Sequence, residues 1–366
     1  MHLGLWTGVL FVLLGLTGSV LTFYPGIDVL INPKIKVTSQ HGGVVSAQKI
    51  YEVLRHEFPE REGSWRIELP MSSTDAVSAR YYKPVETAHK KFAPIMVTID
   101  PVTYQVTSSR YWGEYFVTWI YDLHYTLLAN DLGHDAVGFI GILMLASILV
   151  GYWLWMPKWG RVARNLRPVI RSQKVKKIYD LHMLSGVYGG VFIAIFALTG
   201  VVLAYPQASK TLAVSVLKFD QPMPVFQRLK GPRQAEVDLD SLLQSASVVF
   251  PNSEVRWIES SGADGREVTL RIYNGSEPSK RFPQTYLKFH PVSAQVLYQR
   301  DFHQLPTGDK VWAWVHPLHN GEAFGLTGRV LVALLGLVPA VLMVTGFIRY
   351  LHKRRAKILA KSRELN

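Results

Sequence analysis

The sequence contains no cysteine. This absence excludes disulfide bonds, thiolate-bound zinc, iron–sulfur clusters and covalently attached c-type haem. The chain also lacks a phosphate-binding loop, an HExxH zinc motif and a GxGxxG motif after a strand, which argues against nucleotide, nicotinamide and flavin binding. Any metal ion must therefore be held by histidine, methionine, tyrosine or carboxylate side chains.

Charged residues are scarce. They make up 18% of the chain against 48% hydrophobic residues, and the mean hydropathy of +0.12 is high for a soluble domain. Four uncharged apolar runs, 3–24, 136–156, 183–205 and 330–348, approach the ~20 residues that cross a bilayer. The first run lacks the basic N-terminal flank of a cleaved signal peptide, and its apolar stretch is longer than that of a signal peptide. We expect it to be kept as a helix of the mature protein. We therefore predict four transmembrane helices.

The positive charge is confined to two short stretches. Residues 157–177 carry eight cations and no acid, and residues 349–366 carry seven cations and one acid. Together they hold a net charge of +14, so the rest of the chain sums to −1. Because both stretches flank apolar runs, they fit the positive-inside rule rather than a nucleic-acid footprint. Both stretches and both termini are predicted to be cytoplasmic, with 26–133 and 206–325 on the outer side.

The chain is an internal duplication. Residues of the first apolar run recur 182 positions later, and residues around the second run recur 195 positions later. The first set pairs Gly4, Gly8, Thr17 and Gly18 with Gly186, Gly190, Thr199 and Gly200; the second pairs Trp119, Leu123, His124, Gly133, Gly141 and Gly151 with Trp314, Leu318, His319, Gly328, Gly336 and Gly346. We predict an α-helical membrane protein of two duplicated halves, each with an external α+β domain inserted between its two helices.

Two duplicated histidines are the leading candidates for metal ligands. His124 and His319 each follow a tryptophan with four residues between, just before the second helix of each half. A single histidine in that place usually lies at the membrane interface, but the repeat favours a function. Two imidazoles related by a pseudo-twofold axis would ligate opposite faces of one haem iron, an arrangement suited to electron transfer.

His182 opens the third helix and is a further candidate. Gly186 and Gly190 follow it at helical spacing, so an imidazole and a strip without side chains would share one face, as a flat haem requires. The alternative is a small-residue packing face with an interfacial histidine. The copy of His182 falls at position 0, before the first residue, and His2 is the nearest substitute.

His134 and Arg329 occupy equivalent positions at the outer ends of the second and fourth helices. Either side chain would suit a haem propionate, because arginine and protonated histidine bind carboxylates well. The alternative is an interfacial anchor without a ligand.

Four ordered segments of the chain resemble the signature helices of PepSY-associated transmembrane proteins. They are LGLWTGVLFVLLGLTGSVLTFYPGID, DLHYTLL with GYWLWMPK, YDLHMLSGVYGGVFIAIFALTG, and PLHNGEAFGLTGRVLVALLGL with TGFIRYLHKRR. The resemblance covers nearly the whole chain. Well-understood members resemble inner-membrane ferric-siderophore reductases of the ferrioxamine-utilisation (FoxB-like) type, which bind haem b between their helices.

The resemblance implies two non-covalent b haems with iron ligands from His124, His182, His319 and a histidine on the first helix, for which His2 stands here. We expect His124 to pair with His319 near the outer face and His182 with the histidine of the first helix near the inner face, and the opposite pairing stays open. The resemblance also implies eight segments that lie in the bacterial inner membrane, the periplasm and the cytoplasm. These are transmembrane helix 1 (1–25), a periplasmic PepSY-like domain (26–133), helix 2 (134–156), a cytoplasmic loop (157–180), helix 3 (181–205), a second PepSY-like domain (206–325), helix 4 (326–350) and a cytoplasmic tail (351–366).

The function implied is electron transfer across the membrane to a ferric siderophore, suspected to be of the hydroxamate type such as ferrioxamine. The donor would be a quinol or a cytoplasmic reductant. Aromatic and cationic residues near the outer helix ends, Arg110, Tyr111, Trp112, Tyr115, Arg300 and Trp314, would dock the chelate or form an aromatic belt. Two other classes stay open: a non-enzymatic PepSY adaptor that binds an envelope partner, and a permease for siderophore, haem or iron.

Overall fold

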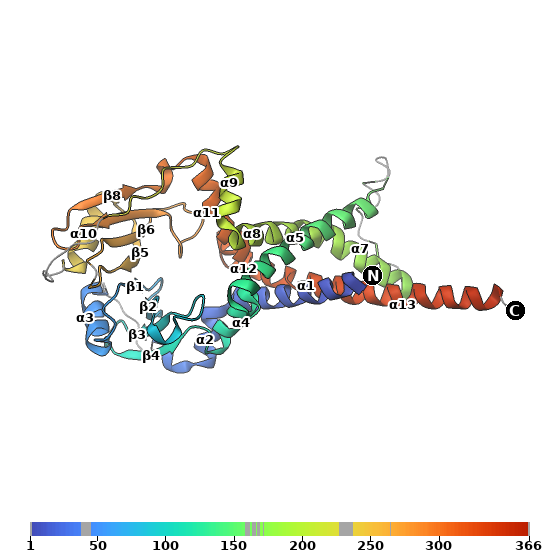
Figure 1. Ribbon diagram of the computed structural model, residues 1–366, viewed down its shortest axis with the longest axis horizontal. Coiled ribbons are helices and arrows are strands. Elements are labelled where there is room, and N and C mark those ends of the chain that lie inside the picture. Colours follow the sequence, from blue (N-terminus) through green and yellow to red (C-terminus); the bar gives the residue numbers. More distant parts are fainter. Residues whose placement is uncertain are drawn as a thin grey trace. The chain divides into compact units, whose positions relative to one another are not determined.

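The computed structural model describes residues 2–37, 45–157, 162, 166, 169–170, 172–226, 237–263 and 265–364, without the side chains of 2–6 and 363–364. The side chain of His2 and the first five cations of the basic loop lie outside the described residues. The chain divides into two compact units (Figure 1). A helical unit comprises Met1–Phe23, Ile120–Ser209 and Val315–Asn366, and a sheet unit comprises Tyr24–Trp119 and Lys210–Trp314.

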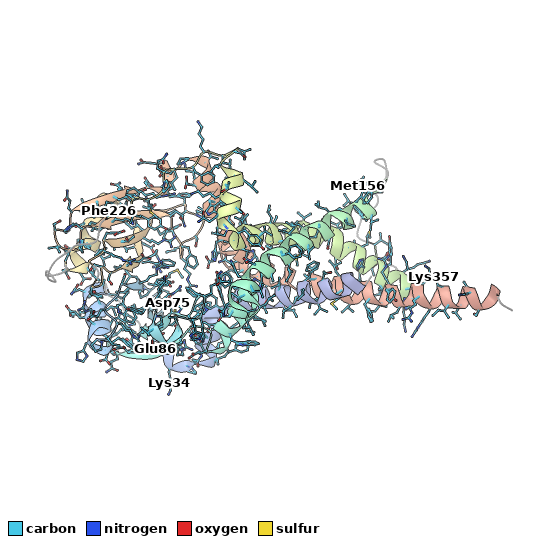
Figure 2. All side chains as sticks on the ribbon, viewed as in Figure 1. Lys34, Asp75, Glu86, Met156, Phe226 and Lys357 are labelled. Carbon is cyan, nitrogen blue, oxygen red and sulfur yellow. The ribbon has the colours of Figure 1, made fainter. Side chains whose placement is uncertain are left out.

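The helical unit contains the apolar helices. Its elements are α1 (His2–Leu21), the end of α4 (Phe116–Thr126), α5 (Asn130–Trp155), α7 (Lys174–Leu184), the π-helical turn η4 (Ser185–Gly189), α8 (Gly190–Ala204), the end of α11 (Thr307–Asn320), η6 (Glu322–Phe324), α12 (Gly325–Leu335) and α13 (Val338–Glu364). Helix α5 packs along α8, and α1 packs against α12 and α13. Beyond its apolar part, α13 continues with exposed cations, Lys357 among them (Figure 2).

The predicted fold class of four transmembrane helices is wrong for the described chain. Three helical stretches are long and apolar enough to cross a membrane: Asn130–Trp155, Lys174–Ala204 and Glu322–Ser362. The first apolar run gives Thr7–Leu21 and then turns by 70° into α2 (Tyr24–Ile31), so it counts as a span only if the bent pair is taken as one. Pro25 explains the break, since its ring nitrogen cannot donate to the carbonyl of Leu21 and continue the helix.

The sheet unit corrects a second part of that fold class. The two halves do not form separate α+β domains, because their strands join in one antiparallel eight-stranded sheet of order β4-β3-β2-β1-β5-β6-β7-β8. The strands are β1 (Trp65–Glu68), β2 (Val77–Tyr81), β3 (Ile95–Ile99), β4 (Val106–Tyr111), β5 (Glu254–Glu259), β6 (Val268–Tyr273), β7 (Thr285–Phe289) and β8 (Val296–Arg300). At the centre Ile67 pairs with Ile258, so the repeats meet strand to strand.

One helix from each repeat covers one face of this sheet. These are α3 (Ala47–Glu57) and α10 (Leu239–Val249). Shorter helices are η1 (Pro33–Ile35), η2 (Val85–Thr87), α9 (Pro206–Ala213) and η5 (Phe302–Gln304). The alternating apolar residues of the strands pack beneath α3 and α10 and are fully buried, with Trp65, Leu242 and Leu270 at the centre. Asp240 of α10 accepts a hydrogen bond from the backbone N–H of Ala47 at 2.7 Å, and Gln48 of α3 accepts one from the backbone N–H of Leu239 at 3.1 Å, so each repeat helps to cap the other.

Candidate metal centre

The helical unit brings two predicted ligands together. The imidazole centroids of His124 and His319 lie 6.2 Å apart with an interplanar angle of 52°. His124 comes from the last turn of α4 and His319 from the last turn of α11. The juxtaposition therefore joins one residue from each repeat, as the pseudo-twofold duplication predicts.

The turn that follows His124 is strained. Leu127, Leu128 and Asn130 have φ angles of 47°, 59° and 50°, a region that residues with a Cβ rarely adopt. At the corresponding turn of the second repeat, Gly321 and Gly325 have positive φ without that cost. Both turns end a short helix immediately before an apolar one, and this holds the two histidines at equivalent places.

A threonine fixes the tautomer of each ring. His124 Nδ1 lies 2.9 Å from Thr17 Oγ1, and His319 Nδ1 lies 3.0 Å from Thr199 Oγ1. Each threonine hydroxyl already donates its single proton to the carbonyl four residues earlier, at 2.7 Å in both cases. The hydroxyl must then accept from Nδ1–H, so the lone pair is at Nε2. This is the tautomer that binds a metal ion through Nε2.

A second acceptor agrees with that assignment for His319. Its Nδ1 also lies 3.0 Å from the backbone carbonyl of Phe196, and a carbonyl oxygen only accepts. Among the described residues, neither His124 nor His319 has a hydrogen-bond partner at Nε2. Both rings thus present an unused lone pair.

The residue after each threonine is a glycine that the imidazole covers. A Cβ at Gly18 would lie 3.2 Å from His124 Cε1, and a Cβ at Gly200 would lie 3.1 Å from His319 Cε1. Both distances are tighter than ordinary van der Waals contact, so a larger side chain would press against the ring. The dipeptide Thr-Gly on one helix and a histidine on another form one structural module.

His182 forms a third copy of this module. Its Nδ1 lies 2.9 Å from Thr345 Oγ1, which donates to the carbonyl of Val341 at 2.6 Å, and a Cβ at Gly346 would lie 3.4 Å from His182 Cε1. The duplication places Val150 and Gly151 where a fourth Thr-Gly pair would be. Val150 has no hydroxyl, and a Cβ at Gly151 would meet nothing within 4 Å. The described part of the chain therefore contains three modules.

The two glycines after His182 do not form the predicted bare strip. The π-helical turn η4 begins three residues after His182 and changes the helical register. A Cβ at Gly190 would lie 3.0 Å from the hydroxyl of Tyr152, and one at Gly186 would lie 3.6 Å from Leu342. Protein side chains fill both places, so Gly186 and Gly190 serve helix packing.

His134 and Arg329 make equivalent contacts within the helical unit. His134 Nε2 lies 3.0 Å from the carbonyl of Ala204, and Arg329 Nε donates to the carbonyl of Thr22 at 2.8 Å. Ala204 and Thr22 are themselves duplicates, 182 positions apart. Each side chain thus caps the carbonyl end of a helix. The predicted propionate contact would compete with these bonds.

The imidazoles of His124 and His319 suit a metal centre that brings most of its own ligands. Among the described residues, no cluster of three or more His, Cys, Asp or Glu side chains surrounds a common point. A metal ion here would have two imidazole nitrogens from the protein and needs its other ligands from elsewhere. A haem would suit this pair, because its porphyrin brings four nitrogens and the imidazoles of His124 and His319 would provide the two that the iron still needs.

Nearly the whole chain matches one known protein family. A family model described as the PepSY-associated TM region matches residues 1–353. The chain belongs to this PepSY-associated transmembrane family. It is also 24% identical over 263 residues to the uncharacterized protein PA4219 of Pseudomonas aeruginosa, a match that covers 67% of this chain and 65% of that protein.

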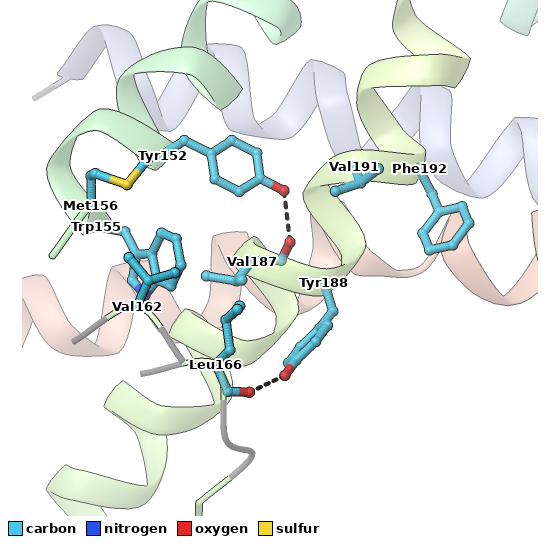
Figure 3. A pocket seen from close by; sticks show the side chains of 9 residues that line it. All are labelled: Tyr152, Trp155, Met156, Val162, Leu166, Val187, Tyr188, Val191 and Phe192. Atoms are coloured by element: carbon cyan, nitrogen blue, oxygen red, sulfur yellow. Dashed lines mark hydrogen bonds between the residues drawn. The ribbon is translucent and has the colours of Figure 1, made fainter. Parts of the chain in front are cut away.

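This PepSY-associated membrane protein also has an apolar pocket of about 420 Å³ in the helical unit (Figure 3). Its lining is Tyr152, Trp155, Met156, Val162, Leu166, Val187, Tyr188, Val191 and Phe192. The hydroxyl of Tyr152 donates a hydrogen bond to the backbone carbonyl of Val187 at 2.6 Å. Val187 lies within the π-helical turn η4. Both tyrosine hydroxyls in the lining are used by backbone carbonyls, so the pocket offers mainly apolar contact.

The predicted docking residues of this PepSY-associated protein belong to the sheet unit and are largely engaged. Arg110 pairs with Asp28 at 2.7 Å and stacks on Tyr115, and Arg300 pairs with Asp309 at 2.8 Å. Trp112 is buried against Phe92. These residues stabilise the outer strands. Nearer the centre of the sheet, Arg80 and Arg281 share the single carboxylate of Glu68.

A buried carboxylate holds two of those arginines and gives a pH prediction. Burial raises the pKa of Glu68, but Arg281 and Arg80 lower it further, so its pKa lies below the usual value. Its contribution to stability is therefore present above about pH 4.5 and is lost as the pH falls toward the folded pKa. We expect Glu68→Gln to destabilise the sheet unit by about 2 kcal/mol at pH 7 and by much less at pH 3. Denaturation followed by tryptophan fluorescence at both pH values checks this, and an equal loss at both would contradict it.

Proposed function

We propose that this protein is an inner-membrane haem b oxidoreductase that carries electrons across the membrane and reduces ferric siderophores, releasing Fe(II). The observation that carries the proposal is the pair of His124 and His319, each with Nδ1 tied to a threonine and Nε2 unused. A histidine that only anchors a helix at the membrane interface does not require a fixed tautomer or a glycine beneath its ring. Here both features are present, and both recur in the second repeat.

The two rings would hold the haem through their Nε2 atoms, and a haem with two imidazole ligands supplies one-electron transfer without an open site for oxygen. Thr17 and Thr199 keep both rings in the ligating tautomer. Gly18 and Gly200 let the two rings approach the neighbouring helices closely. His182 with Thr345 offers one ligand for a second haem.

The chemistry of the substrate fits one-electron transfer. Fe(III) binds hard oxygen ligands tightly, and Fe(II) binds the same ligands much more weakly. One electron per ferric ion therefore frees the metal and leaves the chelator intact. The basic stretches 157–177 and 349–366 follow the second and fourth apolar runs. By the positive-inside rule this supports a cytoplasmic side for both stretches and a periplasmic side for 26–133 and 206–325.

The apolar pocket favours a quinol among the two donors that the sequence leaves open. Most of its lining comes from the end of α5, from η4 and from the start of α8, which belong to the candidate spans, and Val162 and Leu166 come from the basic stretch that follows α5. A quinol would give two electrons and two protons, and so reduce two ferric ions. A soluble flavoprotein would instead need a polar docking surface.

The threonines give a direct test of the ligand assignment. We expect Thr199→Val to lower haem affinity 10- to 100-fold, because the change removes the acceptor that orients the ring but keeps the side-chain volume. Thr199→Ser keeps a hydroxyl and is expected to restore binding. The measurement is haem content per chain, together with the absorption spectrum of the haem that stays bound.

Ser147→Ala is the matched control for that prediction. Ser147 also donates to the carbonyl four residues earlier, Leu143, at 2.7 Å, but touches no histidine. Loss of haem in both Ser147→Ala and Thr199→Val would mean that hydroxyls in these helices matter only for packing.

Activity is tested with a single turnover. The purified protein is reduced, freed of excess reductant and mixed without oxygen with a ferric siderophore in the presence of a ferrous-specific chromogenic chelator. The proposal predicts one Fe(II) trapped per haem re-oxidised. A protein without haem that binds an envelope partner would favour the adaptor, and uptake of intact ferric chelate by vesicles would favour the permease.

A further inference from the structure

The sheet face opposite α3 and α10 carries a ladder of alternating arginines and aromatic rings. Arg66 lies 4.7 Å from the Tyr82 ring and 4.3 Å from the Trp257 ring, and Arg271 lies 4.5 Å from Trp257 and 5.0 Å from Tyr286. Trp257, Arg271 and Tyr286 are directly opposite one another on β5, β6 and β7, so they share one face of the sheet. The ladder crosses the junction between the repeats.

The centre of this face has more positive than negative charge. Arg66 pairs with Glu259, while Arg80 and Arg281 share the single carboxylate of Glu68. Arg271 forms no ion pair among the described residues, and its Nε donates to the carbonyl of Pro283 at 2.9 Å. Four arginines thus face two glutamates, a surplus of two positive charges.

The nearest further acid does not change that balance. Glu277 accepts hydrogen bonds from Thr285 Oγ1 at 2.8 Å and from the backbone N–H of Asn274 at 3.2 Å, so its oxygens are used locally. Burial also raises the pKa of Glu277, which favours its neutral form. The outer arginines of the face are each matched one to one by an aspartate.

Two buried donors on this face lack acceptors. Trp257 Nε1 and Arg80 Nε are buried and have no hydrogen-bond partner within the described parts of the chain. Both can only donate. A group that satisfies them must therefore bring acceptor oxygens, and an anionic group would also neutralise the surplus charge.

We propose that this face binds ferric chelates with net negative charge, of the catecholate class, in preference to neutral or cationic hydroxamate chelates. Three catecholate dianions around Fe(III) give a complex of charge −3, whereas three hydroxamate monoanions give a neutral one. Catecholate rings are also planar and stack on guanidinium groups, as Trp257 and Tyr286 do here. This inference rests on the proposed function for its substrate, and it departs from the hydroxamate class suspected from the sequence.

The test measures binding without electron transfer. Gallium(III) chelates have the charge and shape of the ferric ones but are not reduced under the conditions used, so their binding does not depend on any haem. Equilibrium dialysis of the full chain in detergent against gallium tris-catecholate and gallium trihydroxamate gives both dissociation constants. We expect at least tenfold tighter binding of the tris-catecholate, weakening as salt is added.

Arg271→Gln tests the site itself and is expected to weaken tris-catecholate binding about tenfold. Arg271→Lys, which keeps the charge but loses the planar stack, should give an intermediate value. Arg55→Gln is the control, because it also removes one positive charge but from α3, which covers the opposite face of the sheet. Retained melting temperature in each variant excludes unfolding as the cause.

Three results would overturn the inference: equal binding of both chelates, equal effects of Arg271→Gln and Arg55→Gln, or no binding of either chelate. None of these would affect the haem assignment, which is tested by its spectrum. Conversely, a colourless protein that binds the gallium tris-catecholate through Arg271 would sink the reductase proposal and leave this site standing.

Discussion

Replacing His124 or His319 by alanine is expected to remove one haem equivalent per chain and to abolish Fe(II) release, while the protein still inserts into the membrane. In the proposed haem site each ring would supply one of the two protein nitrogens that hold the iron, and alanine leaves no nitrogen in its place. The rings lie at the ends of α4 and α11, outside the apolar stretches, so insertion does not depend on them. Haem content, membrane yield and single-turnover Fe(II) release are measured on the same preparation.

His56→Ala is the matched control for these variants. Its side chain is 85% exposed on α3 and contacts only the neighbouring Glu57. It should keep full haem content and activity. If His124→Ala and His319→Ala also keep both, the ligand assignment is wrong and the histidines only pack.

The second large effect is expected at the crossing of α1 with the end of α12. A Cβ at Gly336 would lie 2.6 Å from the backbone oxygen of Gly15 and 2.1 Å from Ser19 Oγ, so Gly336→Val would push the two helices apart. Overpacking of this kind costs about 3 kcal/mol or more when backbone atoms are in the way. Since Thr17 lies within the same turn of α1, we also expect the Gly336→Val variant to lose the haem proposed at His124.

Thermal unfolding in detergent and haem content measure that prediction. Gly151→Ala is its control, because a Cβ there meets nothing within 4 Å. The added methyl group should leave the melting temperature within a few degrees of the unchanged protein. Equal stability of the Gly336→Val and Gly151→Ala variants would show that α1 does not pack as closely as described.

The duplication in the sequence predicted the meeting of His124 and His319, because residues related by a pseudo-twofold axis come together near that axis. It did not lead to the threonines. Thr-Gly occurs six times in the sequence, and the copies at 17–18, 199–200 and 345–346 are the ones that meet the three histidines. The dipeptide alone therefore does not identify them. The physical reason for the pairing is that each threonine hydroxyl donates its proton to a carbonyl of its own helix, so it can only accept a hydrogen bond from the imidazole.

Two features of the fold depend on contacts that local patterns do not encode. The pairing of Ile67 with Ile258 joins strands 191 residues apart, and the sequence only indicated that each repeat has strands. The first apolar run has the composition of a membrane span, but Pro25 and the bend before it divide the run from α2. Composition alone therefore overestimated the number of membrane helices.

The most direct measurement is the visible spectrum of the purified protein before and after dithionite, with a pyridine haemochrome assay for haem type and amount. The account predicts a b-type spectrum with low-spin bands and at least one haem per chain, which decreases by one equivalent in His319→Ala. A colourless protein that is folded and membrane-inserted would contradict it, and would leave a PepSY-associated membrane protein whose histidines serve packing alone.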